Sequence, residues 1–263
     1  MEGSNMRLKD KVIIVTGSTT GIGEAIARRC VAQGACVLVH GTRRDAGEKV
    51  VSSLGAAARL HIDDLSEAGA APRLIAAALA AFGKIDGLVN NAAWLVRSNI
   101  HSTNAALFDR AMAINVRAPL LLIQAALESL AANRGSVLNI GSINAYTGEA
   151  NQLVYSISKG ALMTLSRNLG DALGCQGVRV NHLNVGWVLT PNEYQLKISE
   201  GLGADWPEHI PAAYAPSGRI LTPEHIAGAA VYWLSDESRP ISGSVLELEQ
   251  YPIIGRNLPK EDK

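Results

Sequence analysis

The chain of 263 residues contains no long hydrophobic run. Its apolar stretches are interrupted by glycine, asparagine or charge, and none approaches the roughly 20 residues that a membrane-spanning helix needs. The opening residues, MEGSNMRLKDK, are polar and do not form a secretory signal. We therefore expect a cytoplasmic protein that does not insert into a membrane, with residues 1–6 disordered.

Cysteine is scarce, and neither sign of charge dominates. Cys30, Cys36 and Cys175 form no CxxC pair, and their odd number disfavours a disulfide framework. Lys plus Arg equal Asp plus Glu at 24 each, so the formal net charge is zero. This balance argues against nucleic acid or an anionic membrane as the main partner. The six histidines are scattered, so no metal site is expected.

What the sequence does contain is an alternation of β-branched apolar runs and alanine-rich helical stretches. Apolar residues make up 48% of the chain, and its length lies near the upper end for one hydrophobic core. Because the strand-like runs are continuously apolar, we expect strands that are covered on both faces. The pattern predicts one α/β domain over residues 1–263, with a Rossmann-type, doubly wound parallel sheet of about seven strands flanked by helices.

The expected strands cover residues 11–17, 36–41, 58–63, 85–93, 135–142, 178–186 and 244–249. The expected helices cover residues 23–34, 45–54, 66–82, 104–131, 151–174 and 223–234. Residues 190–218 fit neither pattern. A gap of that length in a compact domain is usually functional, so we expect a substrate lid there, or short helices that the pattern hides.

A glycine-rich turn, TGSTTGIG at residues 16–23, follows the first expected strand. Gly17 suits a tight turn, Gly21 lets the backbone approach a pyrophosphate, and Gly23 permits close helix packing. The helix that follows supplies free N–H groups and the positive end of its dipole. The GxxxGxG spacing differs from the longer GxGxxG dinucleotide fingerprint, but the position after the first strand points to the same use.

These residues resemble the short-chain dehydrogenase/reductase family in its form of roughly 250 residues. The resemblance runs from Lys11 to about Glu249, and its motifs come in the family's order: Thr16-Gly17-x3-Gly21-Ile22-Gly23, Asn90-Asn91-Ala92-Ala93, Asn115, Ser142 and Tyr155-x3-Lys159. It implies an NAD(P)-dependent oxidoreductase that interconverts a carbonyl and a secondary alcohol. It also implies a homotetramer, whose main interface would pair the helices at 104–131 and 151–174 across subunits.

The expected catalytic residues are Asn115, Ser142, Tyr155 and Lys159. Tyr155 and Lys159 lie about one helical turn apart, so both side chains share one face. A free tyrosine has a pKa of about 10, and a neighbouring ammonium is expected to lower it toward the range of acid–base catalysis. By resemblance, Tyr155 is the acid–base group and Lys159 also bonds the nicotinamide ribose. Ser142 would bind the substrate oxygen, and Asn115 would hold a water that links Lys159 to solvent.

The end of the second strand bears on the choice between NADP and NAD. Relatives that prefer NAD carry an acidic residue at the position that is Gly41 here, and Thr42 and Arg43 follow it. A guanidinium can hold a 2′-phosphate with two hydrogen bonds, which favours NADP. Thr20 stands where NADP-linked relatives often carry a basic residue, which favours NAD. We predict NADP, with NAD as the alternative.

The resemblance also assigns residues to the rest of the cofactor. Asp64 would meet the adenine amino group, while Val188 and Thr190 would meet the nicotinamide carboxamide. The full predicted cofactor set is Gly17, Ser18, Thr20, Gly21, Ile22, Gly23, Thr42, Arg43, Asp64, Leu65, Asn91, Ala92, Ala93, Ile140, Tyr155, Lys159, Gly186, Val188 and Thr190.

The chain departs from the family's pattern at three places. Val185 replaces the usual proline before Gly186, Ala93 replaces a glycine, and residues 248–251, LEQY, replace the closing VDGG. The last of these turns often lies at a subunit interface in the family, so the assembly is the property most affected.

The candidate substrate residues combine aromatic faces with hydrogen-bonding groups: Trp94, Ser142, Asn144, Gln152, Trp187, Glu193 and Trp206. This mixture suits a polyhydroxylated ring, so we predict a sugar, sugar acid or cyclic polyol. The alternative substrate is a 3-oxoacyl thioester, although a long acyl chain needs a more continuously apolar lid. A cofactor-binding regulator without catalysis is a second class of function, but such proteins typically lose the tyrosine or the lysine. A methyltransferase is disfavoured because methyl transfer has no use for the serine, tyrosine and lysine together.

Overall fold

The computed structural model describes residues 6–254, and within them seven strands form one parallel sheet in the order β3-β2-β1-β4-β5-β6-β7. The strands are β1 (Val12–Val15), β2 (Cys36–Gly41), β3 (Ala58–Ile62), β4 (Gly87–Asn90), β5 (Ser136–Ile140), β6 (Arg179–Val185) and β7 (Val245–Leu248). This confirms the predicted doubly wound sheet of Rossmann type. The prediction of a disordered N-terminus falls mostly on residues 1–5, which lie outside the described residues.

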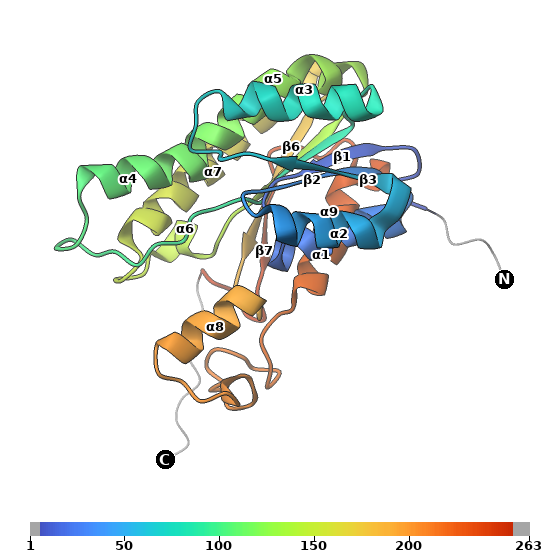
Figure 1. Cartoon of the computed structure of the whole chain (residues 1–263). Helices are drawn as coiled ribbons and strands as arrows, with labels where there is room; N and C mark the ends of the chain where they lie inside the picture. The colour runs from blue at the N-terminus through green and yellow to red at the C-terminus, as the bar shows by residue number, and fades with distance from the viewer. Residues whose placement is uncertain (1–5, 255–263) are drawn as a thin grey trace.

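Helices cover both faces of this sheet (Figure 1). One face carries α1 (Gly21–Ala32), α2 (Arg44–Leu54) and α9 (Pro223–Leu234). The other carries α3 (Ala70–Phe82), α5 (Ala118–Ala132) and α7 (Leu153–Ala172), with α4 (Ala105–Met112) at its side. No helix of the described residues is long and apolar enough to cross a membrane.

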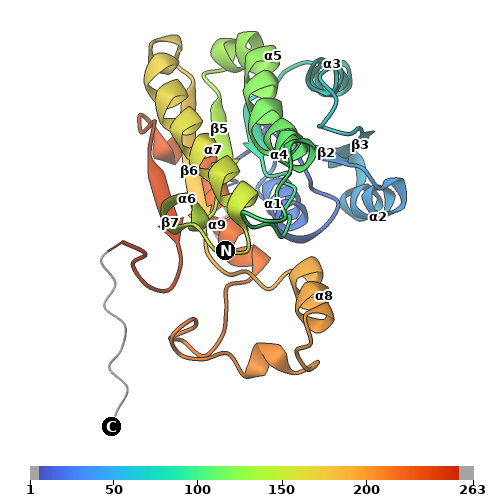
Figure 2. The ribbon, with the colours of Figure 1, turned by 90° about the vertical axis from the view of Figure 1, so that its left-hand side faces the viewer.

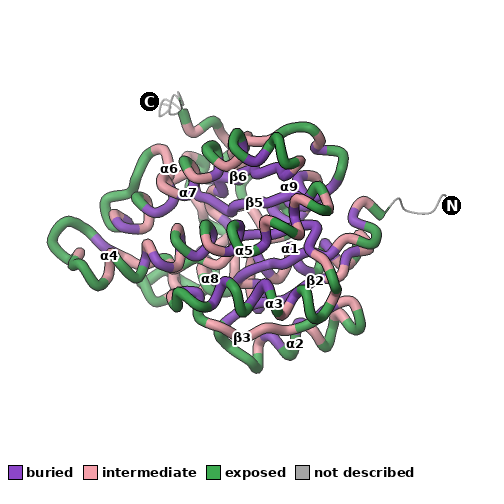
Figure 3. Tube along the Cα trace, turned by 90° about the horizontal axis from the view of Figure 1, so that it is seen from above, coloured by how far each residue is buried: buried purple, intermediate pink, exposed green. Residues whose placement is uncertain are grey.

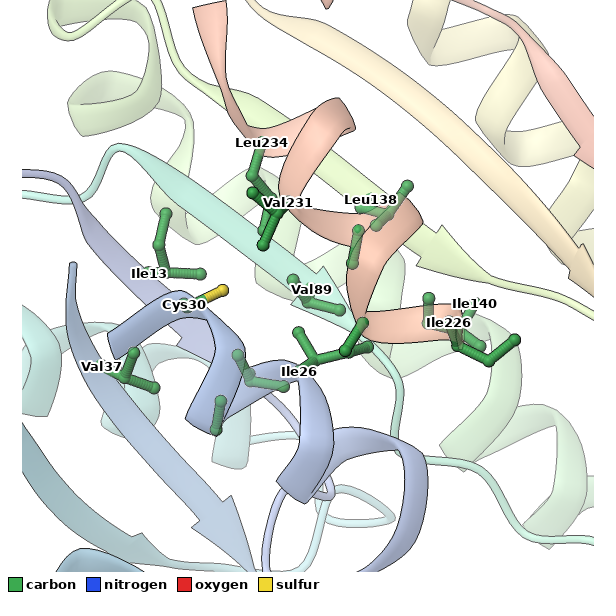
Figure 4. Packing of buried hydrophobic residues seen from close by; sticks show 14 of the residues in the cluster. Ile13, Ile26, Cys30, Val37, Val89, Leu138, Ile140, Ile226, Val231 and Leu234 are labelled. Atoms are coloured by element: carbon green, nitrogen blue, oxygen red, sulfur yellow. The ribbon is translucent and has the colours of Figure 1, made fainter. Parts of the chain in front are cut away.

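The central strands β1, β2, β4, β5 and β6 consist almost entirely of buried residues (Figure 3), whereas the edge strands β3 and β7 are only partly buried. Ile13 and Ile14 are adjacent on β1, and both are fully buried, but they belong to different hydrophobic clusters. This follows from the pleat, which sends successive side chains to opposite faces. Figure 4 shows the first cluster, where Ile26 and Cys30 of α1 and Val231 of α9 meet the sheet. The central strands are continuously apolar because each contributes side chains to two hydrophobic cores, one on either face of the sheet.

The single helix expected at 104–131 is interrupted, which corrects that prediction. Between α4 and α5, residues Ala113–Arg117 form a π-helical turn. Such turns are rare and often mark functional sites, because one residue is bulged out of the regular spacing. Asn115 lies inside this turn and is buried. Apolar periodicity does not reveal a π turn, since the segment stays helical on either side.

Residues 190–218 contain helical structure that the sequence pattern did not resolve. The segment holds α8 (Pro191–Ser199) and a 3-10 turn at Trp206–Glu208. Thr190 caps α8 by accepting the Glu193 N–H at 3.0 Å, and proline occupies its first position. Figures 1 and 2 place this segment beyond the carboxyl edge of the sheet, away from the helical layers. We name residues 190–218 the lid segment.

Candidate functional site

A cleft of about 800 Å³ opens at the carboxyl end of the central strands. Ligands of doubly wound sheets bind at this edge, because the loops that leave neighbouring parallel strands meet there. The cleft brings together predicted site residues from the glycine turn, β4, β5, β6, α7 and the lid segment. These are Ile22, Asn91, Ala93, Ile140, Ser142, Asn144, Gln152, Tyr155, Lys159, Gly186, Trp187, Val188, Thr190 and Glu193.

The glycine turn has the geometry that a bound dinucleotide needs. Gly17 and Gly21 have φ angles of 62° and 58°, which L side chains rarely adopt. A Cβ on Gly17 would lie 2.8 Å from the Ala92 Cα, and a Cβ on Gly23 would overlap the Gly17 carbonyl. Thr20 precedes α1 without a side-chain cap, so the first N–H groups of α1 are left for an external acceptor. The turn therefore fits a pyrophosphate.

Asn91 and Ser18 hold this turn from two sides. The Asn91 amide donates to the carbonyls of Thr16 at 2.9 Å and Gly17 at 3.0 Å. The buried Ser18 hydroxyl donates to the Val15 carbonyl at 2.6 Å and accepts the His40 N–H at 3.0 Å. Its own N–H donates to the His40 carbonyl. Because both groups of Ser18 are used inside the protein, the structure corrects our prediction that this residue contacts the cofactor.

The adenosine end of the site is open at the surface. A Cβ on Gly41 would lie 2.6 Å from a Thr19 methyl, so an acidic side chain has no room there. Thr42 and Arg43, which follow, are exposed. Asp64 is also exposed, and its side chain accepts the Ser66 N–H at 2.9 Å.

Leu65 is the exception at this end. It is buried among the apolar residues of the second core cluster, so its side chain faces the core rather than a ligand. This corrects its predicted place in the cofactor set.

Tyr155 and Lys159 lie beside each other on α7 and both line the cleft. The Lys159 ammonium lies 5.5 Å from the centroid of the Tyr155 ring and donates to the Ile140 carbonyl at 2.7 Å. The Ser142 hydroxyl, which comes from the end of β5, hydrogen-bonds the Tyr155 phenol. Three functional groups therefore converge on one point of the cleft, from a strand end and one helix face.

The electrostatics of this group correct one expectation. Burial raises the pKa of Tyr155 to about 12, the Ser142 hydrogen bond opposes that rise, and the charge of Glu193 adds to it. Burial lowers the pKa of Lys159 to about 8. The expected net lowering of the Tyr155 pKa is therefore wrong for the ligand-free chain, because desolvation of the phenolate outweighs the stabilisation that a neighbouring ammonium gives. At neutral pH Tyr155 is a neutral proton donor.

Asn115 stands behind this group rather than in the cleft. Its amide oxygen accepts the Trp94 N–H at 2.7 Å, and its amide nitrogen donates to the Trp94 carbonyl at 3.1 Å. The same nitrogen donates to the Ser158 hydroxyl at 2.9 Å, one residue before Lys159. Asn115 thus ties the loop after β4 to α7. The Trp94 ring lies outside the cleft lining, 4.9 Å from the Arg110 guanidinium, which corrects its prediction as a substrate residue.

The lid segment closes the far side of the cleft with aromatic rings. Trp187 donates from its indole nitrogen to Glu193 at 2.8 Å, and both residues line the cleft. Trp206 stacks on Trp187, with ring centroids 5.5 Å apart, and is itself 5% exposed. Trp206 therefore packs behind Trp187 instead of facing the cleft, which corrects its prediction as a substrate residue.

Sequence reasoning missed several charged residues of the cleft. Arg97 and Lys197 line it, and both form ion pairs with Glu200 of the lid segment, at 2.7 and 2.8 Å. Glu249 also lines it and accepts the Trp187 N–H at 3.0 Å. Among these residues, only Glu249 could have been found from the sequence, because it lies in the closing turn where LEQY replaces the family's usual VDGG.

The fold and the site together define a dinucleotide-binding α/β protein with a tyrosine–lysine–serine group in the cleft beside the glycine turn. A family model described as Enoyl-(Acyl carrier protein) reductase matches residues 17–249. The chain belongs to the short-chain dehydrogenase/reductase family. It is accordingly an NAD(P)-dependent oxidoreductase.

Known proteins resemble this chain along nearly its whole length. It is 33% identical to 2-(S)-hydroxypropyl-CoM dehydrogenase 3 of Xanthobacter autotrophicus, over 92% of this chain and 96% of that one. The L-sorbose reductase of Gluconobacter frateurii, solved with NADPH and L-sorbose, superimposes with a TM-score of 0.88 at 25% identity, covering 93% of this chain and 97% of that one. A 3-oxoacyl (acyl-carrier-protein) reductase of Agrobacterium tumefaciens, solved with NADP, gives 0.85 at 28% identity, covering 94% and 96%.

Proposed function

We propose that the protein interconverts a carbonyl and a secondary alcohol on a sugar, sugar acid or cyclic polyol, with Tyr155 as the acid–base group. The observation that carries the proposal is the meeting of the Tyr155 and Ser142 hydroxyls beside the buried Lys159, inside a cleft rich in polar side chains. A bound nicotinamide cofactor supplies or accepts the hydride. The backbone N–H groups at the start of α1, with Asn91, Ile140, Val188 and Thr190, would hold that cofactor.

The protein's own groups handle the proton. Tyr155 is protonated at neutral pH and donates its proton to the substrate oxygen in the reductive direction. Ser142 donates a hydrogen bond to the same oxygen and fixes its position. Lys159 stabilises the phenolate that Tyr155 becomes, because its ammonium lies near the ring. The buried Asn115 links this helix to the loop after β4, on the side from which a water would resupply the proton.

The role of Tyr155 is tested by Tyr155→Phe. We expect kcat to fall by at least about 1000-fold, while the fluorescence change on binding reduced cofactor is retained. Tyr146→Phe, a change in the short helix α6 (Asn144–Thr147) outside the cleft lining, is the matched control and should keep wild-type turnover. Wild-type kcat in the Tyr155 variant would refute the mechanism and leave a cofactor-binding role.

The polar side chains within the mixed lining of the cleft favour a polyhydroxylated substrate. Asn144 donates to Gln152 at 3.3 Å, and Gln152 donates to Glu149 at 2.6 Å, so a row of amides and carboxylates begins next to Ser142. Trp187 and Tyr214 supply aromatic faces opposite. The likeness to an L-sorbose reductase supports this choice. A panel of ketoses, lactols, inositols and sugar acids with both cofactors should identify a substrate.

A 3-oxoacyl thioester is the second candidate, and the likeness to a 3-oxoacyl reductase favours it. The charged groups Arg97, Glu149, Glu193 and Lys197 lie along the cleft, and burying them against an acyl chain would be unfavourable. Turnover of acetoacetyl thioesters without activity on the sugar panel would reverse the order of the two candidates.

For the cofactor we propose NADP over NAD. Gly41 leaves no room for a carboxylate at the adenine ribose, and Arg43 is exposed without an ion-pair partner among residues 6–254, whereas Arg44 pairs with Glu48. Arg43→Ala should lower kcat/KM for NADPH by about tenfold and leave NADH unchanged, with Arg44→Ala as control. Equal losses for both cofactors would contradict the proposal.

We also propose a cytoplasmic homotetramer. Cys30, Cys36 and Cys175 are unpaired thiols, which suits a reducing compartment. Leu120 on α5 and Ile157 on α7 expose 42% and 44% of their surface, on the helices that the family pairs across subunits. Light scattering should give four chains per particle, and Ile157→Glu should shift the particle to smaller species.

A further inference from the structure

A continuous chain of buried hydrogen bonds links β4, β5, α7 and β6 and ends at the backbone N–H of Ser142. Asn90 on β4 donates to Asn139 on β5 at 2.8 Å, and Asn139 donates to Ser166 on α7 at 2.8 Å. The Ser166 hydroxyl lies 2.8 Å from His182 Nδ1. The five side chains of this relay are 0–3% exposed: Asn90, Asn139, Ser166, His182 and Asn184.

Its last two bonds reach the active site. His182 Nε2 lies 2.9 Å from the side-chain oxygen of Asn184, on the same strand β6. That oxygen also accepts the N–H of Ser142 at 3.2 Å. The neighbours Gly141 and Ile143 hold the sheet in another way, since their N–H groups donate to the backbone carbonyls of Leu183 and Val185. The Ser142 N–H is therefore the one of the three that depends on a side chain.

The hydrogen-bond partners of the His182 ring assign it a single tautomer. The Asn184 oxygen faces Nε2, so Nε2 must carry the proton and donate. Nδ1 is then an acceptor that faces the Ser166 hydroxyl, which accepts the Asn139 amide and has a second acceptor, the Leu162 carbonyl, at 2.7 Å. With the proton on Nδ1, the Asn184 amide would have to turn over, and its nitrogen would face the Ser142 N–H, leaving two donors opposed. Only the first arrangement leaves no opposed donors around the Asn184 side chain.

Gly141 shows that the local backbone accommodates this pair of side chains. A Cβ on Gly141 would overlap His182 Nε2 and the Asn184 side-chain oxygen. The residue before Ser142 must therefore be glycine for the imidazole to reach the amide. This couples position 141, which directly follows β5, with positions 182 and 184 on β6.

We propose that His182 is a positioning residue for the reaction, which acts through Asn184 to fix the backbone of Ser142 and hence the direction of its hydroxyl. The effect on kcat rests on the proposed function, whereas the effect on the Ser142 backbone does not. Ser142 touches the phenol of Tyr155, so a rotation of its backbone misplaces both hydroxyls relative to the substrate oxygen. Errors of about 1 Å in such groups cost up to about 100-fold in rate.

The first test measures hydrogen exchange at single amides by NMR, and it does not depend on activity. In His182→Leu we expect exchange at the Ser142 amide to accelerate by about tenfold or more. The Gly141 and Ile143 amides should stay within about twofold, because their acceptors are backbone carbonyls. Unchanged exchange at Ser142, or equal acceleration at all three amides, would overturn the proposal.

The second test separates positioning from general stability. His182→Leu should lower kcat by about 10- to 100-fold and leave the Kd for reduced cofactor within about twofold. His182→Gln, which can donate to Asn184 and accept from Ser166, should recover most of the lost kcat.

Asn181→Leu is the matched control for this kinetic test. Asn181 is equally buried on β6 but bonds the β7 side, through the Ile241 carbonyl and the Ser244 N–H, so its loss should reduce stability without lowering kcat. Wild-type kcat in His182→Leu, or an equal kcat loss in Asn181→Leu, would refute the positioning role. If the leucine variant does not fold, Ser166→Ala serves in both tests, since it removes the hydroxyl that faces His182 Nδ1. Absence of turnover in the wild-type protein would instead refute the proposed function, and amide exchange would still decide the inference.

Discussion

The buried ammonium of Lys159 makes the stability of this protein depend on pH in a direction that can be measured. Burial lowers its pKa from 10.5 to about 8 in the folded chain, and the side chain is 3% exposed. The unfolded chain therefore binds the proton more tightly than the folded chain. Below pH 8 the charged ammonium destabilises the fold, and this penalty disappears as the pH rises from 8 to 10.5.

The size of the effect follows from the shift. A difference of about 2.5 pKa units corresponds to about 3 kcal/mol at 1.36 kcal/mol per unit. Lys159→Met removes this penalty but leaves the Ile140 carbonyl without its donor, which costs about 1–3 kcal/mol at every pH. The constant cost cancels when the same variant is compared at two pH values. The stability of the variant relative to wild type should therefore fall by about 2.5 kcal/mol between pH 7 and pH 10.

Urea unfolding of both proteins from pH 7 to pH 10 measures this difference. Burial also raises the pKa of Cys30 to about 12, and this group destabilises the fold in alkali in wild type and variant alike. Tyr155, whose pKa burial raises from 10.0 to about 12, begins to contribute only at the alkaline end of this range. Lys49→Met, on the exposed face of α2, controls for the loss of one lysine and should give a curve parallel to wild type. Parallel curves for Lys159→Met and wild type would show that the ammonium is not desolvated, and the reasoning would fail.

Three further predictions follow from particular contacts. Gly23→Ala should lower the free energy of unfolding by about 1–3 kcal/mol and weaken cofactor binding, because its Cβ overlaps the Gly17 carbonyl. Its control, Gly228→Ala in open space on α9, should raise the free energy of unfolding by up to about 1 kcal/mol, as measured in urea. Burial lowers the pKa of His40 and of His182 to about 4, so the free energy of unfolding should fall as the pH drops from 6.5 to 4, and His40→Gln should reduce that acid loss by about half; an unchanged slope would contradict it. Arg179 is buried and donates to carbonyls at the end of α9, so Arg179→Leu should lower the free energy of unfolding by about 3 kcal/mol, and a loss below 1 kcal/mol would show that the bonds contribute little.

The expected strands and the glycine turn were predictable because their physical causes are local. An apolar run such as residues 12–15 is buried on both faces in any register, and glycine adopts the φ angle of position 17 without the strain that other residues incur. The helix break at Asn115 was not predictable, because a π turn keeps the apolar spacing on either side. The same holds for α8, which carries an N-terminal cap and proline but no buried residue to create a periodic pattern.

Within the candidate site, residue identity was predictable but orientation was not. Ser18 lies in the expected turn, yet its hydroxyl bonds the backbone of β1 and β2. Trp206 lies in the expected lid, yet it stacks behind Trp187 instead of facing the cleft. A motif names the residues near a ligand, but the direction of each side chain depends on neighbours that come from elsewhere in the chain.

The sequence by itself determined the alternating parallel fold, the glycine turn and the spacing of Tyr155 and Lys159, because each depends on residues close along the chain. Only the tertiary structure decided the protonation of that pair, since burial by distant segments moves both pKa values. It also decided which groups hold Ser142, because His182 and Asn184 reach it from a strand some forty residues further along the chain. Such effects depend on distances between remote residues, and those distances exist only once the sheet has formed.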